Sequence, residues 1–151
     1  YGVSPITLSA KKIDNSDPLA KITPVMTLQS SLIAVRAISA GESVGYGSAW
    51  SCHSDTTIGV LAIGYGDGYP RHAANGTPVL INGRRVPIVG LISMDMITVD
   101  LGCSAEDSVG DVAILWGKDL PVEEIAQWAT TIPYELLCNI ARRVQIKVIN
   151  S

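Results

Sequence analysis

The chain has 151 residues, 47% of them hydrophobic and 17% charged, and eleven Lys and Arg against fourteen Asp and Glu give a net charge of −3. This length is typical of one domain with its own core, and the composition excludes a disordered charged tail. The lack of a basic excess argues against a domain that binds nucleic acid or an anionic membrane. Three cysteines without a Cys-x-x-Cys motif indicate neither a disulfide framework nor a cysteine-based zinc site, and they fit a reducing compartment.

Most of the predicted elements are β-strands. Apolar alternation and β-branched runs bounded by turn residues predict seven strands, at residues 26–38, 43–46, 56–63, 78–81, 85–89, 97–101 and 112–115. Asn82-Gly83 lies between two of these runs, and this dipeptide is the strongest short signal for a hairpin because both residues tolerate positive φ.

The hydrophobic period changes near the end of the chain. Pro121 opens a predicted helix, and a second helix is predicted from residue 133 or 134 to 141. After it, Val144, Ile146 and Val148 alternate with other residues and predict a closing strand. The predicted fold is mainly β, a closed β-barrel-like domain with two short helices near the C-terminus.

Two glycine-rich segments are candidates for chemistry. Tyr46 lies between Gly45 and Gly47, which allow a sharp bend and a close approach to the ring. A tyrosine can act as an acid or base where its surroundings lower its pKa from about 10, and the alternative is a structural tyrosine beside a bend. Residues 64–71 (Gly-Tyr-Gly-Asp-Gly-Tyr-Pro-Arg) lack the helix of a phosphate loop, so they form either a rigid surface loop or the lining of an entrance.

Other candidate residues carry weaker signals. In Ser93-Met94-Asp95-Met96, between two predicted strands, the methionines are either core residues or part of a loop whose backbone amide meets an anionic ligand. Cys52-His53 resembles a nucleophile and its base, but adjacent strand residues point to opposite faces, so a cysteine hydrolase is not favoured. With two histidines and no His/Cys cluster, no metal site is predicted.

Five motifs in order resemble the C-terminal domain of bacterial alanine racemases. They are Gly-Glu-Ser-Val-Gly-Tyr-Gly (41–47), Ile-Gly-Tyr-Gly-Asp-Gly-Tyr-Pro-Arg (63–71), Val-Pro-Ile-Val-Gly-Leu-Ile-Ser-Met-Asp-Met (86–96), Ile-Leu-Trp-Gly (114–117) and Ile-Pro-Tyr-Glu-Leu (132–136). The resemblance implies a cytoplasmic pyridoxal phosphate enzyme that interconverts L- and D-alanine for peptidoglycan. It also implies a head-to-tail homodimer in which the N-terminal α/β barrel of one subunit faces the β domain of the other.

The resemblance also implies roles for individual residues. Tyr46 matches the catalytic tyrosine, which acts on the partner subunit's site opposite the Schiff-base lysine of the barrel. Met94 matches the position whose backbone amide meets the substrate carboxylate, and Tyr134 the tyrosine that hydrogen-bonds the cofactor phosphate. The residues matching the corridor to the active site are Tyr65, Arg71 and Ile132. Leu91 departs from the family, which usually has Arg there, and this removes a charge from the corridor.

The resemblance divides the chain into two parts. Residues 1–24, rich in proline and polar residues, are expected to be the linker from an N-terminal α/β barrel, and residues 25–151 the β domain. The start at Tyr1, without a signal-peptide pattern, suggests a piece of a longer protein. No lysine matches the cofactor lysine, so the chain alone is expected to be inactive. The alternative hypothesis is a β-barrel binding or interaction module without catalysis.

Overall fold

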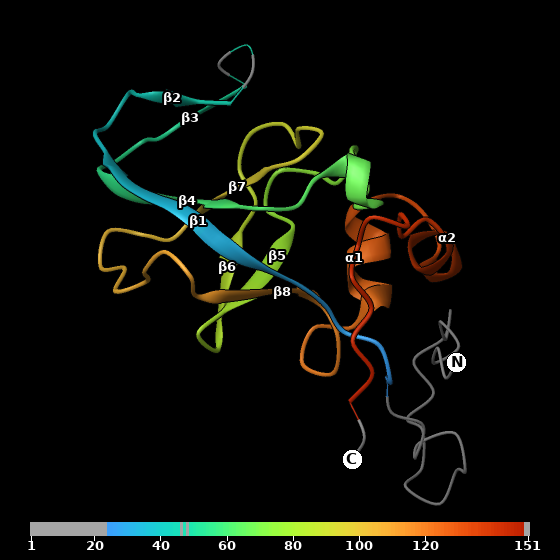
Figure 1. The fold of residues 1–151 in the computed structure, drawn as a ribbon. Helices are drawn as coiled ribbons and strands as arrows, with labels where there is room; N and C mark the ends of the chain where they lie inside the picture. Colours follow the sequence, from blue (N-terminus) through green and yellow to red (C-terminus); the bar gives the residue numbers. More distant parts are fainter. Residues whose placement is uncertain (1–23, 46, 48, 150–151) are drawn as a thin grey trace, which may run out of the picture.

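The computed structural model describes residues 24–45, 47 and 49–149. A six-stranded antiparallel sheet with the order β6-β5-β8-β1-β4-β7 curves into a nearly closed barrel (Figure 1). The predicted mainly β, barrel-like fold is therefore confirmed. The six strands of this sheet are β1 (Leu28–Ile38), β4 (Thr56–Leu61), β5 (Pro78–Ile81), β6 (Arg84–Pro87), β7 (Ile97–Asp100) and β8 (Val112–Trp116).

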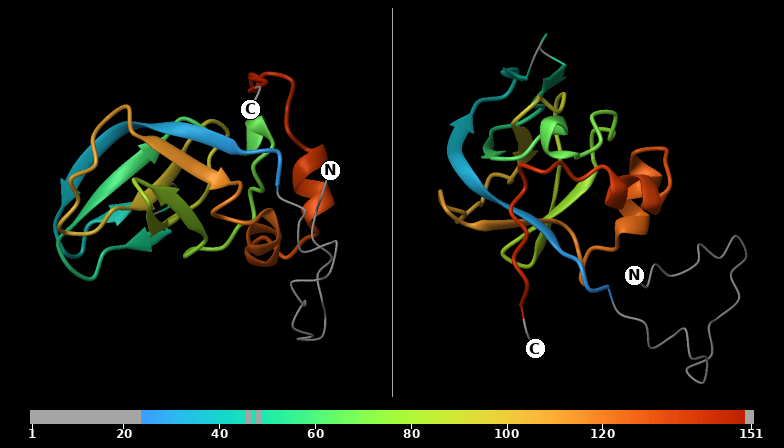
Figure 2. Two further views of the ribbon diagram at one scale, coloured as in Figure 1. Left: turned by 90° about the horizontal axis from the view of Figure 1, so that it is seen from below. Right: turned by 45° about the vertical axis from the view of Figure 1, so that its right-hand side comes forward.

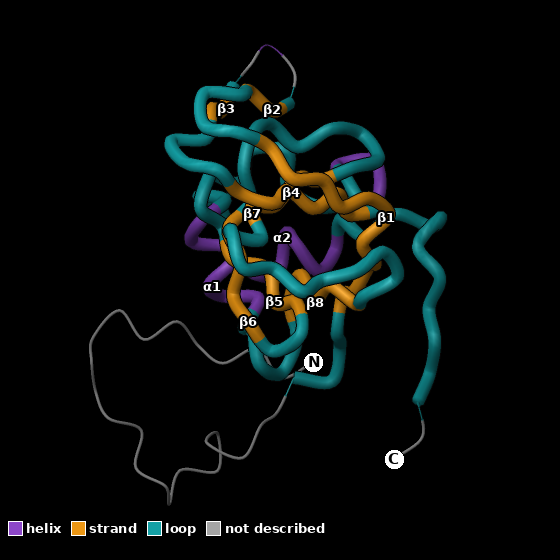
Figure 3. The backbone as a smooth tube through the Cα atoms, turned by 90° about the vertical axis from the view of Figure 1, so that its left-hand side faces the viewer, coloured by secondary structure: helices purple, strands orange, loops and turns teal. Residues whose placement is uncertain are grey.

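The long strand β1 joins the two halves of the barrel. Its first residues pair with β8, and its later residues, from Leu32 onward, pair with β4. Register shifts within both pairings are irregularities of the kind that bend a strand and increase its twist. On the other side of the barrel, an isolated bridge between Ile88 and Val99 connects the end of β6 to β7. Figure 3 shows the resulting ring of strands, with the two helices behind it.

Two hairpins extend from this barrel. β5 and β6 are joined by Asn82 and Gly83, whose φ values of 48° and 75° confirm the predicted turn. The second hairpin consists of β2 (Ser43–Val44) and β3 (Trp50–Ser51) and stands away from the barrel as an arm (Figure 1). The sequence did not predict β3, because two residues are too short to show a pattern. The predicted strand 43–46 ends at Tyr46, which lies outside the described residues.

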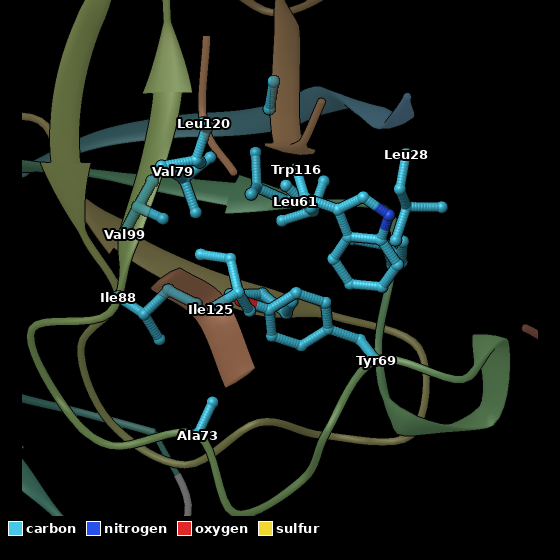
Figure 4. Packing of buried hydrophobic residues seen from close by; sticks show 14 of the residues in the cluster. Leu28, Leu61, Tyr69, Ala73, Val79, Ile88, Val99, Trp116, Leu120 and Ile125 are labelled. Atoms are coloured by element: carbon cyan, nitrogen blue, oxygen red, sulfur yellow. The ribbon is translucent and has the colours of Figure 1, made fainter. Parts of the chain in front are cut away.

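The interior of the barrel and one of its ends are filled by apolar side chains. Tyr69 stacks on Trp116 with ring centroids 5.9 Å apart, among Leu28, Leu61 and Ile125 (Figure 4). The helices α1 (Val122–Trp128) and α2 (Pro133–Cys138) cover this end of the barrel (Figure 2). Helix α1 buries Ile125 completely. No helix that the structure describes is long and apolar enough to cross a membrane.

The predicted closing strand is wrong. Residues 145–149 have no regular structure, and Ile146 and Val148 are 88% and 81% exposed. Alternation shows which side chains of a strand could share a face, but a strand also needs a neighbour for its backbone groups. Among the described residues, no strand pairs with this segment. Helix α2 also ends at Cys138 instead of 141, and beyond it the Ala141 amide donates a hydrogen bond to the Asp67 carbonyl oxygen at 2.9 Å.

Candidate active site

The glycine-rich loop 64–71 begins with a single 3-10 turn, η3 (Tyr65–Asp67). The Asp67 carboxylate accepts a hydrogen bond from the Gly64 amide at 2.9 Å, and the Gly68 amide donates to the Tyr65 carbonyl oxygen at 3.1 Å. Gly68 has a φ of 101°, and a Cβ atom there would lie 2.1 Å from the Asn139 carbonyl oxygen. The loop therefore has the internal hydrogen bonds of a rigid loop, and its conformation requires glycine at position 68.

The loop 93–96 lies directly against this turn. The Tyr65 amide donates to the Ser93 carbonyl oxygen at 3.0 Å, and the Gly66 amide donates to the Met94 carbonyl oxygen at 2.8 Å. A Cβ atom on Gly64 would lie 2.3 Å from the Ser93 oxygen, so only glycine permits this approach. The side chains of Met94 and Met96 are 52% and 47% exposed, which excludes the interpretation of these methionines as core residues.

The Met94 amide faces away from the turn. In a trans peptide the carbonyl and the N–H point in opposite directions, and the Ser93 carbonyl points to Tyr65. Among the described residues, no atom accepts a hydrogen bond from the Met94 N–H, whereas the Ser93 and Met96 amides are both bonded within the loop. A backbone donor in this arrangement can bind an anionic ligand.

Tyr65 and Arg71 meet at a pocket of about 290 Å³ between the glycine-rich loop and α2. The Arg71 guanidinium lies 5.7 Å from the centroid of the Tyr65 ring, within the range of a cation–π contact. Ile132 is 58% exposed and follows Thr131, a residue of the pocket wall, but Ile132 does not line the pocket. The structure thus brings together two of the three predicted corridor residues.

Tyr134 lies in the first turn of α2 and is 59% exposed. Its neighbours Glu135 and Leu136 line the pocket beside Tyr65, whereas Tyr134 does not. The structure therefore places Tyr134 on the same helix as the pocket wall without bringing it into the pocket.

Tyr46 lies outside the described residues, but both flanking glycines are described. Gly45 and Gly47 have φ values of 86° and 68°, as the predicted bend requires. Gly45 lines a second pocket of about 310 Å³ together with Leu91, Ser93 and Met96. Leu91 also lines a neighbouring pocket with Arg71 and His72. The backbone next to Tyr46 is therefore close to the loop that carries Met94.

The weaker candidates from the sequence have structural explanations. Cys52 is buried, and its thiol donates a hydrogen bond to the Ser39 carbonyl oxygen at 2.8 Å, whereas His53 is exposed. The two side chains do not form a nucleophile–base pair. In the described part of the chain, no three His, Cys, Asp or Glu side chains are placed to hold a metal ion.

Sequence reasoning missed Arg143. Its guanidinium forms ion pairs with Asp67 and Asp95, at 2.7 Å each, and so connects the two loops of the site. The sequence separations of 76 and 48 residues explain the omission, because no local pattern indicates such contacts.

Comparisons with known proteins show the family to which the chain belongs. The sequence profile of the family described as "Alanine racemase, C-terminal domain" matches residues 25–148, and the chain belongs to this family. The alanine racemase of Aliivibrio salmonicida is 60% identical over 149 residues, which are 99% of this chain and 40% of that protein. The chain therefore spans about 40% of the length of this relative.

Solved structures show the same likeness. The biosynthetic alanine racemase from Pseudomonas aeruginosa superimposes with a TM-score of 0.84 and 42% identity, over 95% of this chain and 38% of that one. The alanine racemase from Bartonella henselae with covalently bound pyridoxal phosphate gives a TM-score of 0.74 and 36% identity, over 78% of this chain and 33% of that one.

Proposed function

We propose that this chain forms part of a pyridoxal phosphate-dependent alanine racemase that interconverts L- and D-alanine, the D form serving peptidoglycan synthesis. Membership of the alanine racemase C-terminal domain family supports this proposal. The structural observation that carries it is the Met94 amide, a fixed backbone donor that no described residue occupies. This donor is suited to the carboxylate of an amino acid.

Racemisation requires that a proton leaves one face of Cα and another returns to the opposite face, so two bases are needed. We infer that Tyr46 is the base that this chain supplies. Its phenolate oxygen accepts the Cα proton of L-alanine and, as a phenol, returns a proton in the reverse reaction. Gly45, the residue before it, lines the same pocket as Ser93, so the backbone that leads to Tyr46 lies close to the loop that carries Met94.

Tyr65 and Arg71 guide alanine to the site in this proposal. Their cation–π contact and shared pocket support a common role at an entrance. Ile132 would form another part of the corridor wall, and its 58% exposure leaves it free to do so. Because Leu91 lines pockets with Arg71 and with Gly45, the missing arginine at position 91 leaves this corridor with less positive charge.

Tyr134 is the residue of this chain that fits the cofactor. Its phenol is exposed, and no described residue forms a hydrogen bond with it, so it can donate one to a phosphate oxygen. Bound pyridoxal phosphate supplies the delocalisation that stabilises the electron pair left on Cα. The relative from Bartonella henselae has pyridoxal phosphate covalently bound. In this proposal the lysine for that bond belongs to the N-terminal α/β barrel.

The proposed assembly is a head-to-tail homodimer, in which Tyr46 reaches the site on the partner subunit's barrel. Residues 1–24 would be the linker from the barrel, and the family match beginning at residue 25 supports this boundary. Tyr65 and Met94 are 43% and 52% exposed, so both are available to a facing barrel.

Replacing Tyr46 in the full-length enzyme tests the proposed function. Tyr46→Phe keeps the ring and removes the hydroxyl, so racemisation should fall by about 10²–10⁴-fold, the usual contribution of a general acid–base group. The loss of Cα proton exchange should differ between the two enantiomers. Exchange of the Cα proton with solvent deuterium should fail for L-alanine and continue for D-alanine through the lysine.

Tyr65→Phe is the matched control, because it should alter substrate access and leave the exchange of the two enantiomers balanced. An equal loss of exchange from both enantiomers in Tyr46→Phe, or near-normal turnover, would show that Tyr46 is only a structural residue. A wild-type enzyme that binds alanine without racemising it would support the non-catalytic binding module instead.

A further inference from the structure

Arg143 connects three segments that are distant in sequence. Its Nε donates a hydrogen bond to Asp67 Oδ1 at 2.7 Å, and its Nη2 donates to Asp95 Oδ1 at 2.7 Å and to the Met94 carbonyl oxygen at 3.3 Å. A Cβ atom on Gly66 would lie 2.4 Å from Nη2, so the guanidinium packs directly on the backbone of the turn. One side chain from the C-terminal segment thus contacts both loops of the site.

These contacts fix the peptide groups on both sides of Met94. The Ser93 carbonyl is held by the Tyr65 amide, and the Met94 carbonyl is held by the Gly66 amide and by Arg143. The two backbone hydrogen bonds join short loops in which Tyr65 and Met94 are exposed and Gly66 and Ser93 are half-buried, whereas Arg143 adds two charge-assisted bonds that tie Asp67 to Asp95. The direction of the Met94 N–H therefore depends on the contact between the two loops.

The chemistry of this contact suits arginine in particular. A planar guanidinium has five donors in a fixed geometry, so it can serve two carboxylates and a carbonyl at once. Lysine places its charge at a single point and cannot reproduce this pattern. Arg142, the preceding residue, is exposed and has no ion pair with any described residue, which makes it a matched control.

We propose that Arg143 is a positioning residue that sets the affinity of the site for the carboxylate of its amino-acid substrate, by holding the loop 93–96 and its Met94 amide against the turn Tyr65–Asp67. The inference rests on the proposed function, because it takes the Met94 amide as the carboxylate donor. Arg143 itself touches neither substrate nor cofactor in this proposal.

The test compares Arg143→Gln, Arg143→Lys and Arg142→Gln in the full-length enzyme. In Arg143→Gln, the KM for alanine should rise about 5–30-fold, because the Met94 amide is then held less firmly toward the substrate carboxylate, while kcat changes less than about threefold. Arg143→Lys should recover part of this loss because it keeps the charge, and Arg142→Gln should match the wild type.

Hydrogen–deuterium exchange gives a second readout that does not depend on activity. The peptides that contain residues 62–70 and 90–98 should exchange faster in Arg143→Gln than in the wild type, because the Tyr65 and Gly66 amides lose protection. Arg142→Gln should leave this exchange unchanged.

Three results would overturn the inference. An unchanged KM in Arg143→Gln, with a racemising wild-type enzyme, would refute the role of Arg143 and leave the proposed function intact. Equal effects in Arg143→Gln and Arg142→Gln would show a general effect of surface charge. Absence of racemisation in the wild-type enzyme would refute the proposed function and this inference together.

Discussion

Tyr69 places a phenol in the barrel core with no hydrogen-bond partner among the described residues. Its ring stabilises the core by stacking on Trp116. Its hydroxyl, however, loses its hydrogen bonds to water on folding and gains none from the described residues. Burial raises the pKa of the Tyr69 phenol above its usual value of 10.0. At Tyr69 the packing of the ring therefore stabilises the folded state, whereas the desolvation of the hydroxyl destabilises it.

We expect Tyr69→Phe to leave the free energy of unfolding unchanged or to raise it by up to about 1 kcal/mol at neutral pH, because the ring stays and the unpaired hydroxyl is removed. Above pH 10 the unfolded wild type loses the phenolic proton and the folded state keeps it, so wild-type stability falls as pH rises. The free energy of unfolding of Tyr69→Phe should decrease less steeply with pH, because this variant has no phenol to titrate. Urea unfolding at neutral and alkaline pH measures both effects, and a marked loss of stability at neutral pH would reveal a hydrogen bond to the Tyr69 hydroxyl.

At the scale of elements, side-chain hydrogen bonds fasten the β5–β6 hairpin to the loop before β8. The Asn82 amide donates to both Asp107 and Asp111, and Arg84 forms an ion pair with the buried carboxylate of Asp107. The Ser108 backbone amide and the Asn82 side chain lower the pKa of Asp111 below its usual value of 3.8. The hairpin turn therefore has a second role as an anchor for a distant loop.

The lowered pKa of Asp111 predicts that acid weakens the contact between the β5–β6 hairpin and the loop before β8. Asp111 contributes stability that is fully present above pH 3.8 and is lost as the pH falls through its lower folded-state pKa. Asp111→Asn should lower the free energy of unfolding at neutral pH and flatten its decline below pH 3.8. Urea unfolding across this pH range, with the exposed Asp119→Asn as control, is the measurement. If the free energy of unfolding decreased equally with falling pH in Asp111→Asn and in the wild type, the prediction would be wrong.

At the scale of the whole molecule, this chain carries one side of a proposed shared site. Tyr65, Met94 and Tyr134 are all between 43% and 59% exposed, so their side chains are accessible to a facing surface. The described lysines, Lys118 and Lys147, are exposed and line none of the three pockets around Tyr65, Arg71 and Leu91. In the proposed function, the remaining groups for the substrate and cofactor belong to the facing barrel.

The 151-residue chain alone should therefore be inactive and should not hold pyridoxal phosphate at one lysine. After incubation with the cofactor and reduction with borohydride, intact-mass and peptide analysis should find no stoichiometric adduct at a single position. Scattered low labelling of exposed lysines is the expected background. A single fully labelled lysine with racemase activity would contradict the prediction and the shared-site proposal.

The elements that the sequence predicted are those with a strong local signal. The Asn82-Gly83 turn, the alternating strands around it and the helix after Pro121 depend on φ preferences and on a hydrophobic period, which neighbouring residues determine. The motifs around Tyr46 and Tyr65 were likewise visible, because rare glycine patterns stand out in a single chain, whereas the Met94 segment carried only a weak signal by itself.

Strand pairing and contacts between loops depend on residues that are distant in sequence, so only the tertiary structure decided them. The alternation at Val144, Ile146 and Val148 could not show that no described strand pairs with this segment. The contact of Ser93 and Met94 with the glycine-rich turn, and the ion pairs of Arg143 that support it, join residues that are distant in sequence. Sequence periodicity reports which side chains can be buried, whereas hydrogen bonds between loops arise only once the closed barrel has brought the loops together.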